Sequence, residues 1–220
     1  MITRQAIVIG LGQFGLAVAQ SLHRQGVEVL GIDLREERHA LTRGHFDVLV
    51  ADATEEGVIE RLKPADRDLC VVAIGDEARE GSIMVTALLK QAGARLIVAR
   101  ATDDLHARIL ALVGAHRVVN PERAFGERLA QSLLHEGLLE SVPLGEDMEV
   151  SEIKLPTAWV GRSLSDLSLP RRARLLVVAV RREQAGHGVV LQPSPTDALR
   201  EGDLLVTVGP KGAAATVVGG

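Results

Sequence analysis

The first 33 residues combine a short apolar run, a glycine-rich turn, a helical pattern and an acidic residue, in that order. Residues 6–9 are all apolar, and the segment Gly10-Leu11-Gly12-Gln13-Phe14-Gly15 follows directly. A helix is expected from there to about residue 25, and a second apolar strand over 27–32 ends at Asp33. In this strand, turn, helix, strand and acid arrangement, a GxGxxG motif gains a structural context and a mechanism.

Each part of the motif has a physical role in binding a phosphate. Gly10 permits a tight turn, Gly12 lets the backbone approach a phosphate, and Gly15 lets the helix pack closely on the strand. The start of the helix offers free N–H groups and the positive end of the helix dipole. Asp33 can accept hydrogen bonds from a ribose diol. The alternative is a glycine turn in an ordinary α/β unit, but the context favours a nucleotide site.

The alternation of strands and helices continues to about residue 135. Further strands are expected over 48–51, 69–73, 96–99 and 117–119, and helices over 34–43, 55–63, 78–92, 103–113 and 120–135. This pattern predicts an α/β fold, a Rossmann-like doubly wound parallel sheet that binds ligands beyond the carboxyl ends of its strands. Polar residues stand at those ends and are expected to line one crevice: Asp33, Asp52, Thr54, Asp76, Arg100 and Glu122. Thr54 is also suited to cap the helix that follows it.

The last helix of this half carries a wide apolar stripe that includes Phe125, Leu129 and Leu133. The stripe could pack on the chain's own sheet or on another subunit, and periodicity does not separate the two.

After residue 137 the pattern changes. We predict a nucleotide-binding domain over residues 1–137, a linker over 138–147 and a small α+β domain over 148–220. Residues 148–155 alternate between apolar and polar, as in a strand with one solvent-exposed face. Further strands are expected over 175–180, 189–191 and 204–208. The Gly/Ala-rich residues 209–220 are expected to be frayed.

Composition narrows the function classes. The net charge is −4, and the chain has only three Phe, one Trp and no Tyr, which disfavours nucleic-acid binding. Cys70, the single cysteine, lies in an expected buried strand, which fits a reducing compartment. No apolar stretch approaches the roughly 20 residues of a membrane helix. We therefore expect a cytoplasmic protein whose membrane role, if any, comes through a partner.

A dinucleotide-dependent dehydrogenase is the main rival function. Without tyrosine, the chain lacks a Tyr-x-x-x-Lys pair, and it contains neither an HExxH metal motif nor a GxSxG nucleophile motif. His106 and His116 flank one expected helix and are predicted to lie at the surface. We expect no enzymatic activity, because so few groups meet the requirements of a catalytic site.

An ordered set of short motifs resembles one family. The matching stretches are Gly10–Gly15, Ala51-Asp52-Ala53-Thr54, Val72-Ala73-Ile74-Gly75, Val113-Gly114-Ala115, Val119-Asn120-Pro121-Glu122, Gly126-Glu127-Arg128-Leu129-Ala130 and Leu199–Leu205. They resemble the TrkA/KtrA-type RCK subunits (regulators of potassium conductance) of bacterial potassium uptake systems, in family order and over nearly the whole chain. The resemblance implies an RCK_N domain followed by a smaller RCK_C domain.

The resemblance also implies a function. Such a subunit senses nucleotide and gates a membrane potassium channel or transporter of the TrkH/KtrB type from the cytoplasmic face. It forms a homodimer that assembles into a tetramer or octamer ring. The alternatives are an NAD-dependent oxidoreductase and a stand-alone nucleotide sensor.

Site roles follow from the same resemblance. In such a site, Gly10, Gly12 and Gly15 approach the phosphates, and Arg100 lies near them. Asp33 holds the ribose, and Asp52 and Thr54 lie near the adenine. Ile74 and Gly75 lie beside the base or the ribose. Gln13, Phe14, Leu34 and Ala53 complete the implied nucleotide site. Glu122 corresponds to an acid that faces the phosphates, with potassium, sodium or magnesium as its implied cation.

Gln13 departs from the family pattern, because many ATP-binding relatives carry arginine there. A neutral amide cannot neutralise a terminal phosphate as a guanidinium does. We expect an adenine nucleotide, ADP or ATP first, with AMP and NAD(H) as alternatives; Asp33 would repel the 2′-phosphate of NADP. Some relatives bind cyclic di-AMP at the C-terminal domain, where Arg171, Arg172 and Arg174 form a basic run that a solvated face explains equally well.

Overall fold

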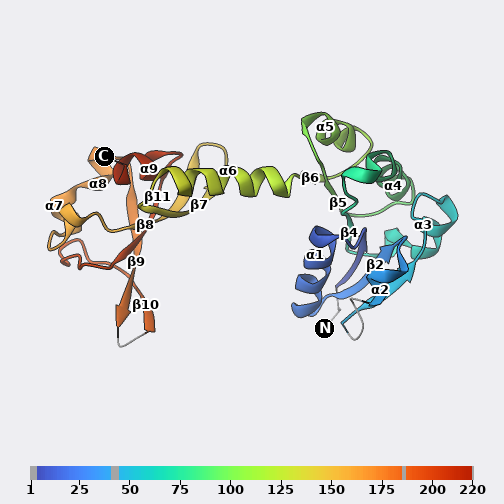
Figure 1. The fold of residues 1–220 in the computed structure, drawn as a ribbon, viewed down its shortest axis with the longest axis horizontal. Helices are drawn as coiled ribbons and strands as arrows, with labels where there is room; N and C mark the ends of the chain where they lie inside the picture. The colour runs from blue at the N-terminus through green and yellow to red at the C-terminus, as the bar shows by residue number, and fades with distance from the viewer. Residues whose placement is uncertain (1–3, 41–44, 185–186, 220) are drawn as a thin grey trace. The chain divides into compact units, whose positions relative to one another are not determined.

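The computed structural model describes residues 4–40, 45–184 and 187–219. The chain forms two compact units, Met1–Glu122 and Arg123–Gly220 (Figure 1).

The first unit is built on a six-stranded sheet. Its strands are β1 (Gln5–Ile9), β2 (Glu28–Asp33), β3 (Asp47–Val50), β4 (Leu69–Val72), β5 (Ile97–Arg100) and β6 (Arg117–Val119). All neighbouring pairs are parallel and the strand order is β3-β2-β1-β4-β5-β6. This is the predicted Rossmann-like, doubly wound order, which reverses between β1 and β4 and leaves a crevice at that point.

Helices connect these strands. They are α1 (Gln13–Arg24), α2 (Glu36–Ala40), α3 (Glu56–Leu62), α4 (Arg79–Gln91) and α5 (Asp104–Leu112), with short 3-10 helices η1 (Pro64–Asp66) and η2 (Asp76–Ala78). The end of the helix expected over 34–43 lies outside the described residues.

Side chains of β1 alternate between two apolar cores, one on each face of the sheet. Ile7 and Ile9 belong to a core that includes residues of α3, α4 and α5. Val8 belongs to a second core with Ala19 of α1, against which Phe14 also packs. Cys70 of β4 is fully buried, and burial raises the pKa of its thiol to about 12, so the thiol stays protonated at neutral pH.

The second unit holds an antiparallel sheet. Its strands are β7 (Leu138–Leu144), β8 (Met148–Lys154), β9 (Leu176–Gln184), β10 (His187–Leu191) and β11 (Leu204–Pro210), in the order β10-β9-β11-β8-β7. Short helices η3 (Thr157–Trp159), α7 (Leu164–Leu167), α8 (Leu169–Arg172) and α9 (Ala213–Val218) accompany it. Its core includes Ile153 and Leu205 from the central strands β8 and β11.

Two expectations for this half are wrong. Residues 138–144, expected to be a linker, form β7, which pairs with β8 around the positive-φ residue Gly145. Residues 209–220 were expected to fray, yet β11 continues to Pro210, and α9 buries Ala214 and Ala215. The small side chains of Ala214 and Ala215 allow α9 to pack closely on the core of the second unit. The strand expected over 175–180 is confirmed as β9, which extends to Gln184.

Helix α6 (Pro121–Leu134) begins in the first unit and continues into the second. It buries none of its residues, and Phe125, Leu129, Leu133 and Leu134 are exposed. Its own unit therefore leaves the apolar stripe uncovered. Within the part of the chain that the structure describes, no helix is both long and apolar enough to span a bilayer.

Candidate nucleotide-binding site

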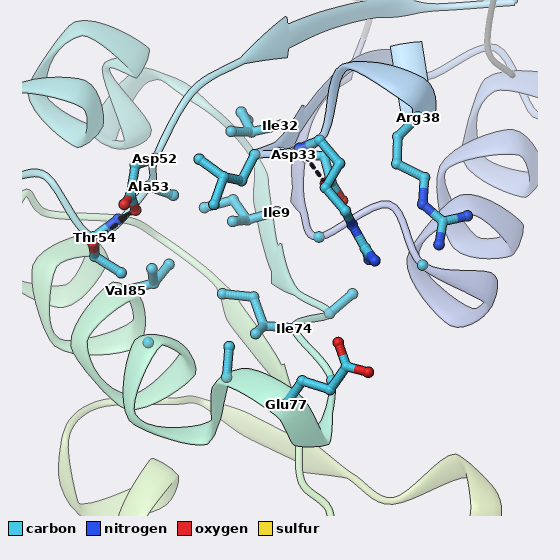
Figure 2. A pocket seen from close by; sticks show the side chains of 18 of the residues that line it. Ile9, Ile32, Asp33, Arg38, Asp52, Ala53, Thr54, Ile74, Glu77 and Val85 are labelled. Atoms are coloured by element: carbon cyan, nitrogen blue, oxygen red, sulfur yellow. Dashed lines mark hydrogen bonds and ion pairs between the residues drawn. The ribbon is translucent and has the colours of Figure 1, made fainter. Parts of the chain in front are cut away.

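A pocket of about 640 Å³ lies at the carboxyl ends of β1 to β5 (Figure 2). Most of the predicted site residues line it, namely Gly10, Gly12, Asp33, Leu34, Asp52, Ala53, Thr54, Ile74, Gly75 and Arg100. The topology therefore brings five segments, far apart in the sequence, to the crevice where the strand order reverses.

The glycine turn is shaped by close packing. Gly10 has a φ of +90°, and Gly15 approaches so closely that a β-carbon on it would lie 1.8 Å from the carbonyl oxygen of Gly10. Gly12 differs, because apart from its chain neighbours no described atom lies within 4 Å of the β-carbon it lacks. Gly12 precedes α1 and has no side chain to cap it, so the first-turn N–H groups are available to an anion.

Asp33 at the end of β2 braces this turn. Its Oδ2 accepts a hydrogen bond from the Leu11 amide at 2.7 Å, and its Oδ1 accepts one from the Arg35 amide at 2.9 Å. The carboxylate is 8% exposed. A carboxylate oxygen can accept more than one hydrogen bond. Asp33 can therefore hold the turn and still accept a hydrogen bond from a ribose hydroxyl.

Asp52 and Thr54 form a local pair after β3. Asp52 Oδ1 accepts hydrogen bonds from the Thr54 hydroxyl at 2.7 Å and the Thr54 amide at 2.9 Å. These bonds hold the pKa of Asp52 below its usual value, so the group is ionised at neutral pH. Thr54 was expected to cap α3, but Glu55 is the N-cap, and the Thr54 hydroxyl donates to Asp52.

Arg100 at the end of β5 is already paired. Its Nη2 lies 2.7 Å from Glu122 Oε1 and 4.0 Å from Asp76 Oδ1. Its Nε is buried and has no partner among the described atoms. A phosphate near Arg100 would therefore compete with Glu122 for the same guanidinium.

Four predicted site residues do not line the pocket: Gln13, Phe14, Gly15 and Glu122. Gln13 is exposed, Phe14 packs against a core, and Gly15 acts through the shape of the turn. Glu122 is connected to the pocket through Arg100. Among the described residues, no group of three or more His, Cys, Asp or Glu side chains could hold a metal ion.

Several residues of the pocket lining were not predicted from the sequence. Arg35 and Arg38 lie just beyond Asp33, and Glu77 lies on the opposite wall in η2 (Figure 2). Ile9, Ile32 and Val85 supply apolar surface. Because the segment after the acid of the second strand borders the ribose position, its two arginines could have been predicted as contacts.

His106 was predicted to be a surface residue, and this is wrong. It is fully buried, with Nε2 2.8 Å from Ser82 Oγ of α4 and Nδ1 3.3 Å from the Thr102 amide. The Thr102 amide can only donate, so Nδ1 accepts and Nε2 carries the proton. Burial lowers the pKa of His106, and the nearby Arg79 adds to that effect.

Comparison with known families agrees with this architecture. Residues 6–121 match the TrkA-N domain and residues 148–218 match the TrkA-C domain. The chain belongs to the family of proteins with these two domains. Ktr system potassium uptake protein A of Vibrio alginolyticus is 35% identical over 94% of this chain and 93% of its own length. Ktr system potassium uptake protein C of Bacillus subtilis is 31% identical over 94% of this chain and 92% of its own length.

Solved structures share the fold. The GsuK channel bound to NAD covers all of this chain with a TM-score of 0.65 at 17% identity, but this chain spans only 40% of that channel. The same channel bound to ADP matches 62% of this chain and 36% of its own with a TM-score of 0.52 at 16% identity.

Proposed function

We propose that the chain is a nucleotide-sensing regulatory subunit of a potassium uptake system. One observation carries the proposal: relatives that match this chain over 94% of its length are Ktr potassium uptake proteins. The pocket, which is lined by most of the residues expected to bind nucleotide, supports it. The pocket combines an open helix N-terminus after Gly12 with a ribose acceptor at Asp33. This combination suits an adenine nucleotide.

The finer assignments are also proposals. The nucleotide is ADP or ATP, with AMP and NAD(H) as alternatives, and the similar GsuK channel has been solved with NAD and with ADP. The partner is a TrkH/KtrB-type membrane subunit, which the chain contacts from the cytoplasm as a homodimer assembled into a ring. Glu122 with the phosphates would hold a cation, and the C-terminal unit would take cyclic di-AMP.

A regulatory role fits the pocket better than catalysis. Its described lining contains no His, Cys, Lys or Tyr side chain that could serve as a general acid or nucleophile near neutral pH. Asp52 is stabilised as a carboxylate by Thr54, which makes it a poor proton donor. Steady NAD(P)H consumption with a small carbonyl substrate would favour the oxidoreductase alternative.

Potassium flux tests the proposal. A KtrB-type channel subunit would be placed in proteoliposomes with and without this chain, and flux measured with ATP, with ADP and with no nucleotide. We expect flux to depend on the chain and on which nucleotide is present, because a ligand shifts a gating equilibrium only by its different affinity for the two states. Flux that changes with the chain but not with nucleotide would contradict the proposal.

A further inference from the structure

The charges that line the pocket are nearly balanced, and most are engaged within the chain. The described lining contains four carboxylates, from Asp33, Asp52, Asp76 and Glu77, and three guanidiniums, from Arg35, Arg38 and Arg100. One net negative charge remains. A ligand with several phosphates would meet little net attraction unless individual cations are free to face it.

Two of the three guanidiniums are already near carboxylates. Arg100 is paired with Glu122 at 2.7 Å, and Arg35 Nε lies 3.7 Å from Asp33 Oδ1. Arg38 has no ion pair with a carboxylate among the described residues, although it is partly buried. It is therefore the lining cation that can turn to a ligand without giving up an existing partner.

The direction of Arg38 fits a phosphate contact. Figure 2 shows its side chain extending from α2 into the pocket, on the side of the turn between β1 and α1. Gly12 of that turn lines the same pocket, and the α1 N-terminus behind it offers its free N–H groups. A guanidinium presents several donors in a plane and suits phosphate oxygens well.

We infer that Arg38 is a specificity residue that recognises phosphate charge beyond the first phosphate of the bound nucleotide. It supplies this charge from within the same chain, whereas Gln13 is exposed, neutral and outside the pocket lining. The site then favours nucleoside di- and triphosphates over a monophosphate. This inference rests on the proposed nucleotide-binding function. It goes further by naming the residue that distinguishes nucleotides by their number of phosphates.

Calorimetric titration of the full chain with ATP, ADP and AMP tests the inference. Arg38→Gln should weaken ATP binding by about tenfold, which is the range of one charge-assisted hydrogen bond, and weaken AMP binding by less than about twofold. Arg38→Lys keeps the charge and should lie between Arg38→Gln and the wild type. Arg95→Gln removes an exposed charge just before β5, at the amino ends of the strands and outside the pocket lining, and should leave all three affinities unchanged.

The possible results distinguish a failure of the role of Arg38 from a failure of the proposed nucleotide-binding function. Unchanged ATP affinity in Arg38→Gln, or equal weakening of ATP and AMP, would overturn the role of Arg38 while leaving the proposed function intact. A wild-type chain that binds none of the three nucleotides would overturn the proposed function and this inference with it. Thermal unfolding of each variant would accompany the titrations, so that a loss of binding is not confused with a loss of fold.

Discussion

Two buried side chains, Asp33 and His106, link the pocket to the rest of the first unit through hydrogen bonds. Asp33 joins the end of β2 to the glycine turn through the Leu11 amide. His106 joins α5 to α4, the helix whose residues Gly81 and Val85 line the pocket. Both residues therefore hold pocket walls in position.

His106 should make the stability of the first unit depend on pH. Its pKa is lowered in the folded chain, so below about pH 6.5 the unfolded chain binds more protons and the free energy of unfolding falls as pH falls. The charged groups near it are Arg79, Asp103 and Asp76. One group contributes at most about 1.4 kcal/mol per pH unit.

Urea unfolding of the wild type and His106→Gln between pH 7.5 and 5 measures this contribution. We expect the wild type to lose more stability over this range than the variant, because glutamine can donate to Ser82 but does not titrate. Parallel pH profiles for the two proteins would contradict this role of His106.

At the scale of single elements, α1 and α3 carry glycines with opposite consequences. A β-carbon at Gly15 of α1 would lie 1.8 Å from the Gly10 carbonyl oxygen. One at Gly57 of α3 would have no described atom within 4 Å apart from its chain neighbours and the backbone of its own helix. Gly15→Ala should lower the free energy of unfolding by about 1–3 kcal/mol or more, as overpacking does. Gly57→Ala should raise it by about 0.5–1 kcal/mol, because alanine favours helix. Chemical denaturation of both variants tests the pair, and a stable Gly15→Ala variant would mean that the turn is not closely packed.

Much of the first unit could be predicted from the sequence, because each strand is a short apolar run and polar residues mark its end. The second unit was harder to predict. Pro143 and Gly145 suggested a linker, but Pro143 lies in β7 at the edge of the sheet, where a missing N–H is tolerated. Gly209 looked like part of a frayed tail, yet a β-carbon there would lie 2.6 Å from Leu175.

The glycines, the polar residues at strand ends and Arg100 were predicted to line the pocket, whereas Arg35 and Arg38 were not. Gly10, Gly12, Asp33 and Asp52 follow from strand ends and glycine spacing, which fix the backbone. The inward direction of Arg38 and the burial of His106 depend on packing between elements distant in sequence, which one-dimensional periodicity does not contain.

At the scale of the whole molecule, the exposed face of α6 predicts association. Leu129 and Leu133 are 44% and 75% exposed. Apolar side chains that share one face of a helix normally pack against another protein surface. The double variant Leu129→Gln/Leu133→Gln should weaken self-association by tenfold or more, roughly the effect of losing one or two buried leucines. The free energy of unfolding of the single chain should change little, because both leucine side chains are exposed in the single chain.

Sedimentation analysis over a range of concentrations measures this effect. Gln131→Ala changes an exposed polar residue of the same helix and is the matched control. A wild-type chain that stays monomeric, or a double variant that associates as the wild type does, would contradict a subunit interface on α6.

Titration of the purified chain with ATP and ADP, run in parallel on Gly12→Ala, tests the central claim most directly. Gly12 has a φ of −66° and open space beside it, so alanine fits the fold and its methyl group occupies space needed by a phosphate. We predict one nucleotide per wild-type chain, and for Gly12→Ala an unchanged unfolding temperature with affinity at least about tenfold weaker. Equal nucleotide affinity in the two proteins, or none in the wild type, would contradict a nucleotide site at this pocket.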